Sequence, residues 1–333
     1  MAKHPSKTKT KALKKKVLEA GPHKSFRRTY REDYLREDKT PGMMHHILAS
    51  FRMIFKSWKL FLPFLVLVVV LDIVLIGLMS ESNYAGMQET LDKNSQEISG
   101  EKMGGLAKAG AMLVSTITTG GLAGESKEVT MVFSILIFLM IWLVTIFILR
   151  HKLAKNKIKL RDALYNAMTP LLSTLVVFLV ALVQCIPIFL LIIAYSAAVQ
   201  TGFLNTPFYA LLFVGFAILM IVLSGYLLSS SIIALVAVSA PGLYPMVALT
   251  TASELMMGRR IKFILRLIAL MLVIGLIWVV VMLPLILFDM AMKQFAWTTG
   301  IPFIPICLVI MTSFTEIYAT TYLFLYYRWL LEE

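Results

Sequence analysis

The chain has little of what secreted proteins and most enzymes depend on. Its 333 residues include only two cysteines, Cys185 and Cys307. Both lie inside apolar stretches, where cysteine behaves as a small apolar residue rather than as half of a disulfide. Only 15% of the residues are charged, against about a quarter in an average soluble protein. These shortages exclude a disulfide-stapled domain and argue against a soluble fold.

Catalytic and metal-binding motifs are absent as well. The sequence contains no glycine-rich phosphate-binding loop, no nucleophile elbow and no zinc-protease helix. All five histidines lie in the N-terminal tail or beside a predicted membrane surface. His45 and His46 would point about 100° apart on a helix, so they cannot chelate one ion. We therefore expect neither enzymatic activity nor a metal or other cofactor.

Apolar residues dominate instead, at 59% of the chain. A helix needs roughly 20 of them to cross the ~30 Å core of a bilayer. Six stretches reach that length: 60–79, 129–149, 171–195, 208–228, 264–288 and 302–325. They predict an all-α, polytopic helical membrane protein whose residues 43–333 form one six-helix membrane domain.

Three of the predicted spans carry features of irregular helices. Pro187 and Pro284 should kink the third and fifth spans, and each frees a carbonyl that a neighbouring helix or a hydroxyl must satisfy. The fourth span could run on through the serines at 229–231 to Val238, which would make it tilted or broken near its end.

Basic residues gather on one side of these spans. All but five of the 32 lysines and arginines precede the first span, separate the second from the third, lie just before or at the start of the fifth, or follow the sixth. The positive-inside rule then predicts that both termini are cytoplasmic and that the loop over 80–128 is external. Eight basic side chains at the membrane ends are expected to contact the headgroups of anionic lipids: Lys56, Lys59, Lys155, Lys157, Lys159, Arg161, Arg259 and Arg260.

Two hydrophilic segments flank the first span. Residues 1–42 are basic and poor in apolar side chains, which favours disorder. This tail is either a solvated segment drawn to anionic lipid, which we favour, or a contact for ribosomal RNA or an acidic protein. The external loop over 80–128 is expected to be a lid or connector with an amphipathic helix at 103–118. Its alternative role is a cap that binds a partner or gates a substrate.

A short amphipathic segment precedes each odd-numbered span on the basic side. Its apolar residues recur three or four positions apart, as expected of a helix that lies in the membrane interface. They are Ile47, Phe51, Ile54, Phe55 and Trp58, then Leu153, Leu160, Leu164, Ala167 and Met168, then Met246, Leu249, Ala252 and Met256. The pattern predicts three repeats, each an interfacial helix followed by a transmembrane hairpin. The alternative is that any basic loop becomes apolar as it approaches a membrane.

Two of these lead-in segments resemble those of a known group. Residues 248–260, ALTTASELMMGRR, and residues 54–60, IFKSWKL, are similar to segments of bacterial six-span membrane proteins of the YciC type. The same group includes the membrane region attached to some glycerophosphoryl diester phosphodiesterases. The resemblance covers residues 45–330 in topology. It implies a multi-pass protein of the bacterial cytoplasmic membrane without a catalytic barrel.

Three polar residues inside the predicted spans are the candidates for function: Asp72, Gln184 and Glu316. A charge at mid-bilayer costs at least about 2.5 kcal/mol, so such residues face protein or a wet cavity. At 1.5 Å per residue, Asp72 and Glu316 both lie roughly 18 Å from the basic side, which predicts that they are neighbours. They form either a proton or cation pathway, with Gln184 and nearby hydroxyls, or a hydrogen-bonded packing contact. The hydroxyls in question belong to Ser224, Thr312, Ser313 and Thr315.

We therefore expect a non-enzymatic integral membrane protein that supports envelope integrity or scaffolds a membrane complex with protein partners. The alternative is a small-solute or ion transporter that uses the intramembrane carboxylates. A third hypothesis is a membrane-anchored protein that binds nucleic acid through its basic tail. We do not favour it, and we expect no nucleic-acid partner.

Overall fold

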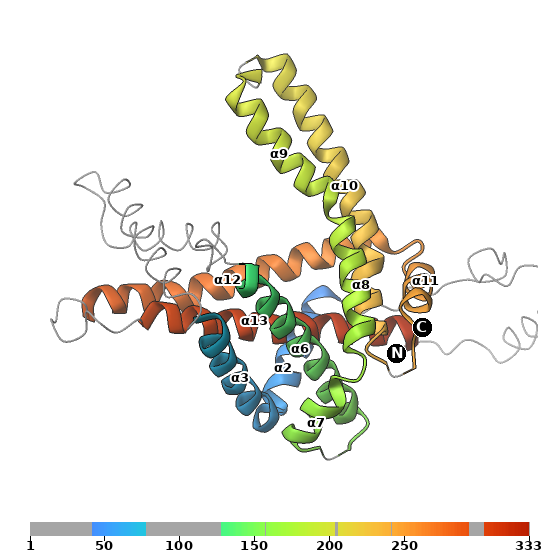
Figure 1. The fold of residues 1–333 in the computed structure, drawn as a ribbon, viewed down its shortest axis with the longest axis vertical. Coiled ribbons are helices and arrows are strands. Elements are labelled where there is room, and N and C mark those ends of the chain that lie inside the picture. The colour runs from blue at the N-terminus through green and yellow to red at the C-terminus, as the bar shows by residue number, and fades with distance from the viewer. Residues whose placement is uncertain are drawn as a thin grey trace, which may run out of the picture.

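A computed structural model describes residues 42–77, 128–156, 158–203, 206–240, 242–292 and 303–332 (Figure 1). The predicted tail up to residue 41, nearly all of the predicted external loop and its helix at 103–118 lie outside these residues. Throughout the described ranges the regular secondary structure is helical.

Six helices in the described part of the chain are long and apolar enough to span a membrane. They are α3 (Trp58–Asp72) continued by the π-helix η2 (Ile73–Gly77), α6 (Glu128–Leu153), α8 (Leu171–Gln184) with α9 (Ile186–Gln200), α10 (Pro207–Ala237), α12 (Arg260–Met292) and α13 (Phe303–Glu332). They coincide with the six predicted spans, so the polytopic helical membrane fold is confirmed. The fourth span continues through its serines to Ala237 as one unbroken helix.

A short helix precedes each odd-numbered span, as predicted. These helices are α2 (Met43–Lys56), α7 (Leu160–Ala167) and α11 (Pro245–Leu255). Each buries a face against the other helices: α7 buries Ala163 and Ala167, and α11 buries Ala248 and Ala252. Because alanine has a small side chain, these helices approach their neighbours closely.

The same lead-in helices also present apolar side chains outward. Met44 and Leu48 of α2 and Met246 of α11 are among the most exposed apolar residues. A helix with one face on protein and another apolar face exposed fits the boundary between membrane domain and headgroups. The predicted interfacial segments are therefore packed elements of the domain as well as candidates for lipid contact.

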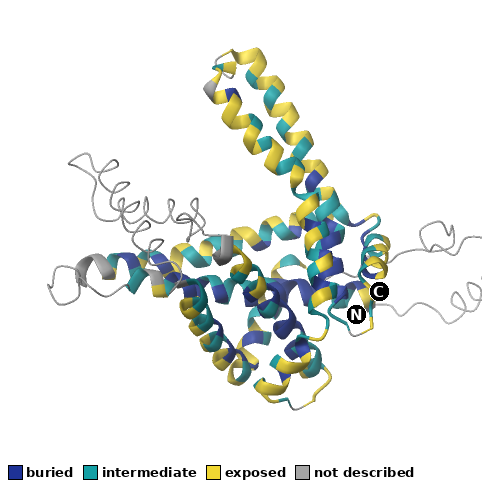
Figure 2. Ribbon diagram, in the orientation of Figure 1, coloured by how far each residue is buried: buried dark blue, intermediate teal, exposed yellow. Residues whose placement is uncertain are grey.

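The buried core lies around α6 and α13. The most apolar 18-residue stretch is 56% buried in each of these two spans, against 11% in α8–α9 and 6% in α10. Only the last part of α10, from Ser224 to Ala237, contributes buried residues. Figure 2 shows the same contrast, with dark blue concentrated in the body and yellow along the hairpin of α9 and α10 that extends from it. The second and sixth spans are thus the centre of the domain, and the third and fourth present most of their surface to the surroundings.

Candidate functional site

The first candidate site joins two helices that are far apart in sequence. Asp72 is the last residue of α3, where the α-helix passes into the π-helix η2. Its Oδ2 accepts a hydrogen bond of 3.2 Å from the hydroxyl of Ser313 on α13. Ser313 is buried, and its hydroxyl also lies 2.8 Å from the carbonyl oxygen of Val309. Asp72 therefore connects the first span to the last.

Glu316 lies on the same face of α13, three residues beyond Ser313. Three residues are just under one helical turn, so the two carboxyl groups lie near the same contact, as their predicted depths indicated. The Oε2 atom of Glu316 is buried and has no hydrogen-bond partner among the described residues. Within a bilayer such an oxygen is costly to leave without a partner. Asp72, Ser313 and Glu316 together form what we call the carboxyl contact.

The neighbouring hydroxyls of α13 are used within the domain. Thr312 donates to the carbonyl of Val309 at 2.9 Å, and Thr315 donates to the carbonyl of Met311 at 2.7 Å. Thr315 also accepts a 2.9 Å hydrogen bond from the indole of Trp278 on α12. These two predicted pathway residues thus bond to their own helix, and Thr315 also links α12 to α13.

Gln184 belongs to a different contact, which the break before Pro187 creates. The third span is interrupted at Cys185, and Pro187 lies in the first turn of α9, where proline is tolerated. The amide of Ile188, which would bond to Gln184 in a continuous helix, donates to the carbonyl of Cys185 at 3.0 Å. The freed carbonyl of Gln184 accepts instead from the hydroxyl of Ser224 on α10, at 2.8 Å.

The side chain of Gln184 strengthens the same connection. Its Oε1 accepts a 2.7 Å hydrogen bond from Ser231, seven residues beyond Ser224 on α10. At this break a hydroxyl of the neighbouring helix thus bonds to a free carbonyl, but this carbonyl is that of Gln184 and not that of Val183, to which the amide missing at Pro187 would have donated. At Pro284, by contrast, α12 continues without interruption to Met292.

The basic residues predicted at the headgroups differ in their surroundings. Those with exposed side chains are Lys56, Lys59, Lys155, Lys159 and Arg161. Lys157 lies outside the described residues. Arg259 is only 5% exposed, and Arg260 stacks on the ring of Tyr226, 3.8 Å from its centroid. The chain turns at Gly258, where φ is +78°, and this turn directs Arg259 into the protein instead of toward the surface.

Sequence reasoning missed a buried histidine at the N-terminal end of the domain. His46 of α2 is fully buried, with its ring 4.0 Å from that of Trp329 and 4.8 Å from that of Tyr322, both on α13. Neither ring nitrogen has a hydrogen-bond partner in the described ranges. Burial, assisted by the charges of Arg266 and His45, lowers the pKa of His46 from 6.5 to about 4. This histidine is therefore neutral at pH 7.

Comparison with known proteins adds no information about the function of this chain. No protein-family model, no curated protein and no solved structure matches the chain. The function is therefore argued from the helix contacts and their chemistry.

Proposed function

We propose that the chain is a non-enzymatic structural component of a bacterial cytoplasmic membrane, one that supports envelope integrity or holds a membrane complex together. The supporting observation is that the three candidate residues lie at contacts between helices. Asp72 bonds α3 to α13, and Gln184 bonds the break between α8 and α9 to α10. Glu316 lies beside the first of these contacts with its Oε2 atom buried. Polar side chains inside a membrane protein commonly hold helices together in this way.

The exposure of the third and fourth spans supports the scaffold role. The hairpin of α9 and the first part of α10, residues 207–223, is apolar, and almost none of it is buried against the rest of the chain. It offers a long apolar surface to lipid and to the helices of partner proteins. The body, in contrast, has its own core around α6 and α13.

We also propose that both ends of the membrane domain face the cytoplasm. His46 near its start contacts Trp329 near its end, so the two ends lie on one side. The excess of lysine and arginine on that side supports a cytoplasmic orientation. With Cys185 and Cys307 replaced by alanine, Arg161→Cys should react with a membrane-impermeant maleimide in inverted vesicles and not in intact cells. The opposite result would reverse the orientation.

A second candidate function is transport of protons or small cations. It is favoured by Glu316, whose buried Oε2 lacks a partner within the described part, beside a second carboxyl group. Ionisable residues at this depth are common in ion pathways. The π-helix that follows Asp72 is also of a kind that recurs at functional sites.

Removing both carboxyl charges distinguishes the two functions. For the double variant Asp72→Asn and Glu316→Gln, we expect unchanged flux and a stability change of no more than about 1 kcal/mol, because both amides preserve side-chain shape. Proton and cation flux is measured in proteoliposomes, and stability by thermal challenge in detergent.

The matched control is Glu254→Gln, which removes an exposed charge from α11 outside the spans. The contradicting result has two parts: the wild-type protein shows flux that the double variant lacks, and the double variant is as stable as the control. That result would replace the structural role by transport.

A further inference from the structure

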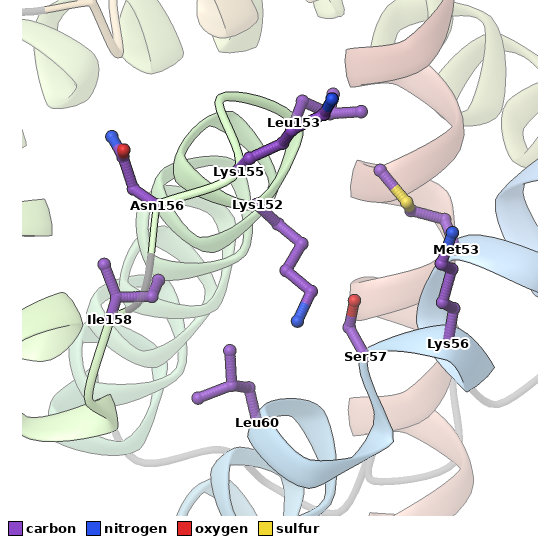
Figure 3. A pocket seen from close by; sticks show the side chains of 9 residues that line it. All are labelled: Met53, Lys56, Ser57, Leu60, Lys152, Leu153, Lys155, Asn156 and Ile158. Carbon is purple, nitrogen blue, oxygen red and sulfur yellow. The ribbon is translucent and has the colours of Figure 1, made fainter.

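A cavity of about 580 Å³ lies between the first two spans on the lysine-rich side. Its walls come from the end of α2, the turn at Ser57, the start of α3, the end of α6 and the loop that follows α6 (Figure 3). Its volume falls within the range of about 300–1,000 Å³ that is typical of ligand-binding cavities. None of the proposals above uses it.

The lining of this cavity is basic and lacks acidic residues. Lys56, Lys152 and Lys155 contribute three ammonium groups, and Asn156 contributes an amide. None of the three lysines forms an ion pair with a carboxylate of the described ranges. Leu60, in the first turn of the first span, adds an apolar wall that continues toward the bilayer. Such a lining matches an anionic group attached to an apolar body.

Ser57 supplies the observation that points to a ligand. It is 3% exposed, and its hydroxyl is buried without a hydrogen-bond partner among the described residues. The hydroxyl does not cap α3, although Ser57 occupies the N-cap position of that helix. Figure 3 shows the Ser57 hydroxyl and the Lys152 ammonium both pointing into the cavity. Buried hydroxyls normally have a partner, so an acceptor between these two donors would complete the site.

The backbone at Lys155 is the second unusual feature. α6 ends in a Schellman motif, in which the amide of Asn156 donates to the carbonyl of His151 and the amide of Lys155 to that of Lys152. The motif requires a left-handed residue at the position of Lys155, where φ is +59°. Glycine is the usual residue there because a side chain is strained in this conformation. A lysine at this position adds a charge to the cavity at the expense of backbone strain.

We propose that this cavity binds a phosphate group, with the Ser57 hydroxyl and the Lys152 ammonium as donors and Lys56 and Lys155 as further counter-charges. The phosphate belongs either to an anionic phospholipid headgroup or to a free phosphorylated solute. The proposal depends on neither the structural nor the transport function.

Binding is tested on the purified full-length protein in detergent by calorimetric titration with three compounds. Dioctanoyl phosphatidic acid carries a phosphate on short lipid chains, dioctanoylglycerol carries the chains alone, and inorganic phosphate carries no chains. We expect saturable binding of the phosphatidic acid and none of the dioctanoylglycerol. Equally tight binding of inorganic phosphate would identify a free phosphorylated solute as the source, whereas binding of the phosphatidic acid alone would identify a lipid headgroup.

Three variants connect that binding to the cavity. Lys152→Ala should weaken phosphatidic acid binding about tenfold and Ser57→Ala about fivefold, as expected for the loss of a charged and a neutral donor. Lys155→Gly should also weaken binding while it raises thermal stability, because it relieves the left-handed strain; its loss of binding cannot then be due to unfolding. Arg52→Ala, which removes an exposed basic residue of α2 outside the cavity lining, should change binding less than about twofold.

Three results would overturn the proposal. They are equal binding of phosphatidic acid and dioctanoylglycerol, no saturable binding of either phosphate compound, and wild-type affinity in all three cavity variants.

Discussion

Replacing Tyr322 with alanine is expected to lower the free energy of unfolding by about 3–5 kcal/mol, the usual cost of removing a fully buried aromatic ring. Tyr322 lies in the middle of the contact between the last span and the lead-in helix α2, where its ring packs edge-on against His46. The loss therefore removes packing between the two ends of the membrane domain. It is measured by titration with sodium dodecyl sulfate in mixed micelles.

Two further variants make this prediction specific. Tyr165→Ala removes a ring that is 84% exposed on α7, and should cost less than about 0.5 kcal/mol. Tyr322→Phe should leave stability unchanged or raise it, because the hydroxyl is buried and has no partner in the described part of the chain. If Tyr322→Ala is no more destabilising than Tyr165→Ala, α2 does not pack on the last span as described.

Acidification is expected to destabilise the protein through His46. The unfolded state gains a proton near pH 6.5, whereas the folded state gains it only near pH 4, where the pKa of buried His46 lies. The contribution of neutral His46 is therefore complete above pH 6.5, is lost progressively as the pH falls toward 4, and remains lost below it. A pKa difference of this size corresponds to about 3 kcal/mol.

The His46→Phe variant isolates this effect from the titration of other groups. Phenylalanine keeps a flat ring against Tyr322 and Trp329 but cannot take up a proton, so stability should fall less between pH 6.5 and 4 than in the wild type. The groups facing His46 are Arg266 from α12, His45 on its own helix, and the tyrosines of α13. His151→Phe, at the end of α6, serves as the control. Parallel pH profiles for wild type and His46→Phe would contradict the assignment.

Most of the fold could be predicted because lipid imposes strong rules on sequence. The six spans follow from apolar length, and the lead-in helices follow from helical spacing beside basic residues. The closeness of Asp72 and Glu316 follows from counting residues from the membrane surface. A proline inside a span also predicts a helix break with a free carbonyl, but neither the carbonyl, which is that of Gln184, nor its partner Ser224 could be named in advance.

The remaining features depend on tertiary contacts that local sequence does not encode. Arginine is usually a surface residue, yet Arg259 is buried directly after the turn at Gly258. His46 becomes buried because tyrosines four residues apart on α13, followed by Trp329, form a surface that receives it. That spacing was visible in the sequence, but the helix that packs on it was not. The strain at Lys155 likewise depends on where α6 ends.

The central claim is that the polar residues inside the spans hold helices together. A double-mutant cycle with Asp72→Ala and Ser313→Ala tests this claim most directly, because it separates the coupling between the two side chains from the effect of each substitution alone. We predict a coupling free energy of about 0.5–1.5 kcal/mol between the two residues. Asp72→Ala with Thr315→Ala, whose hydroxyl bonds elsewhere, should be additive. Additivity of the Asp72 and Ser313 variants within about 0.3 kcal/mol would contradict the account.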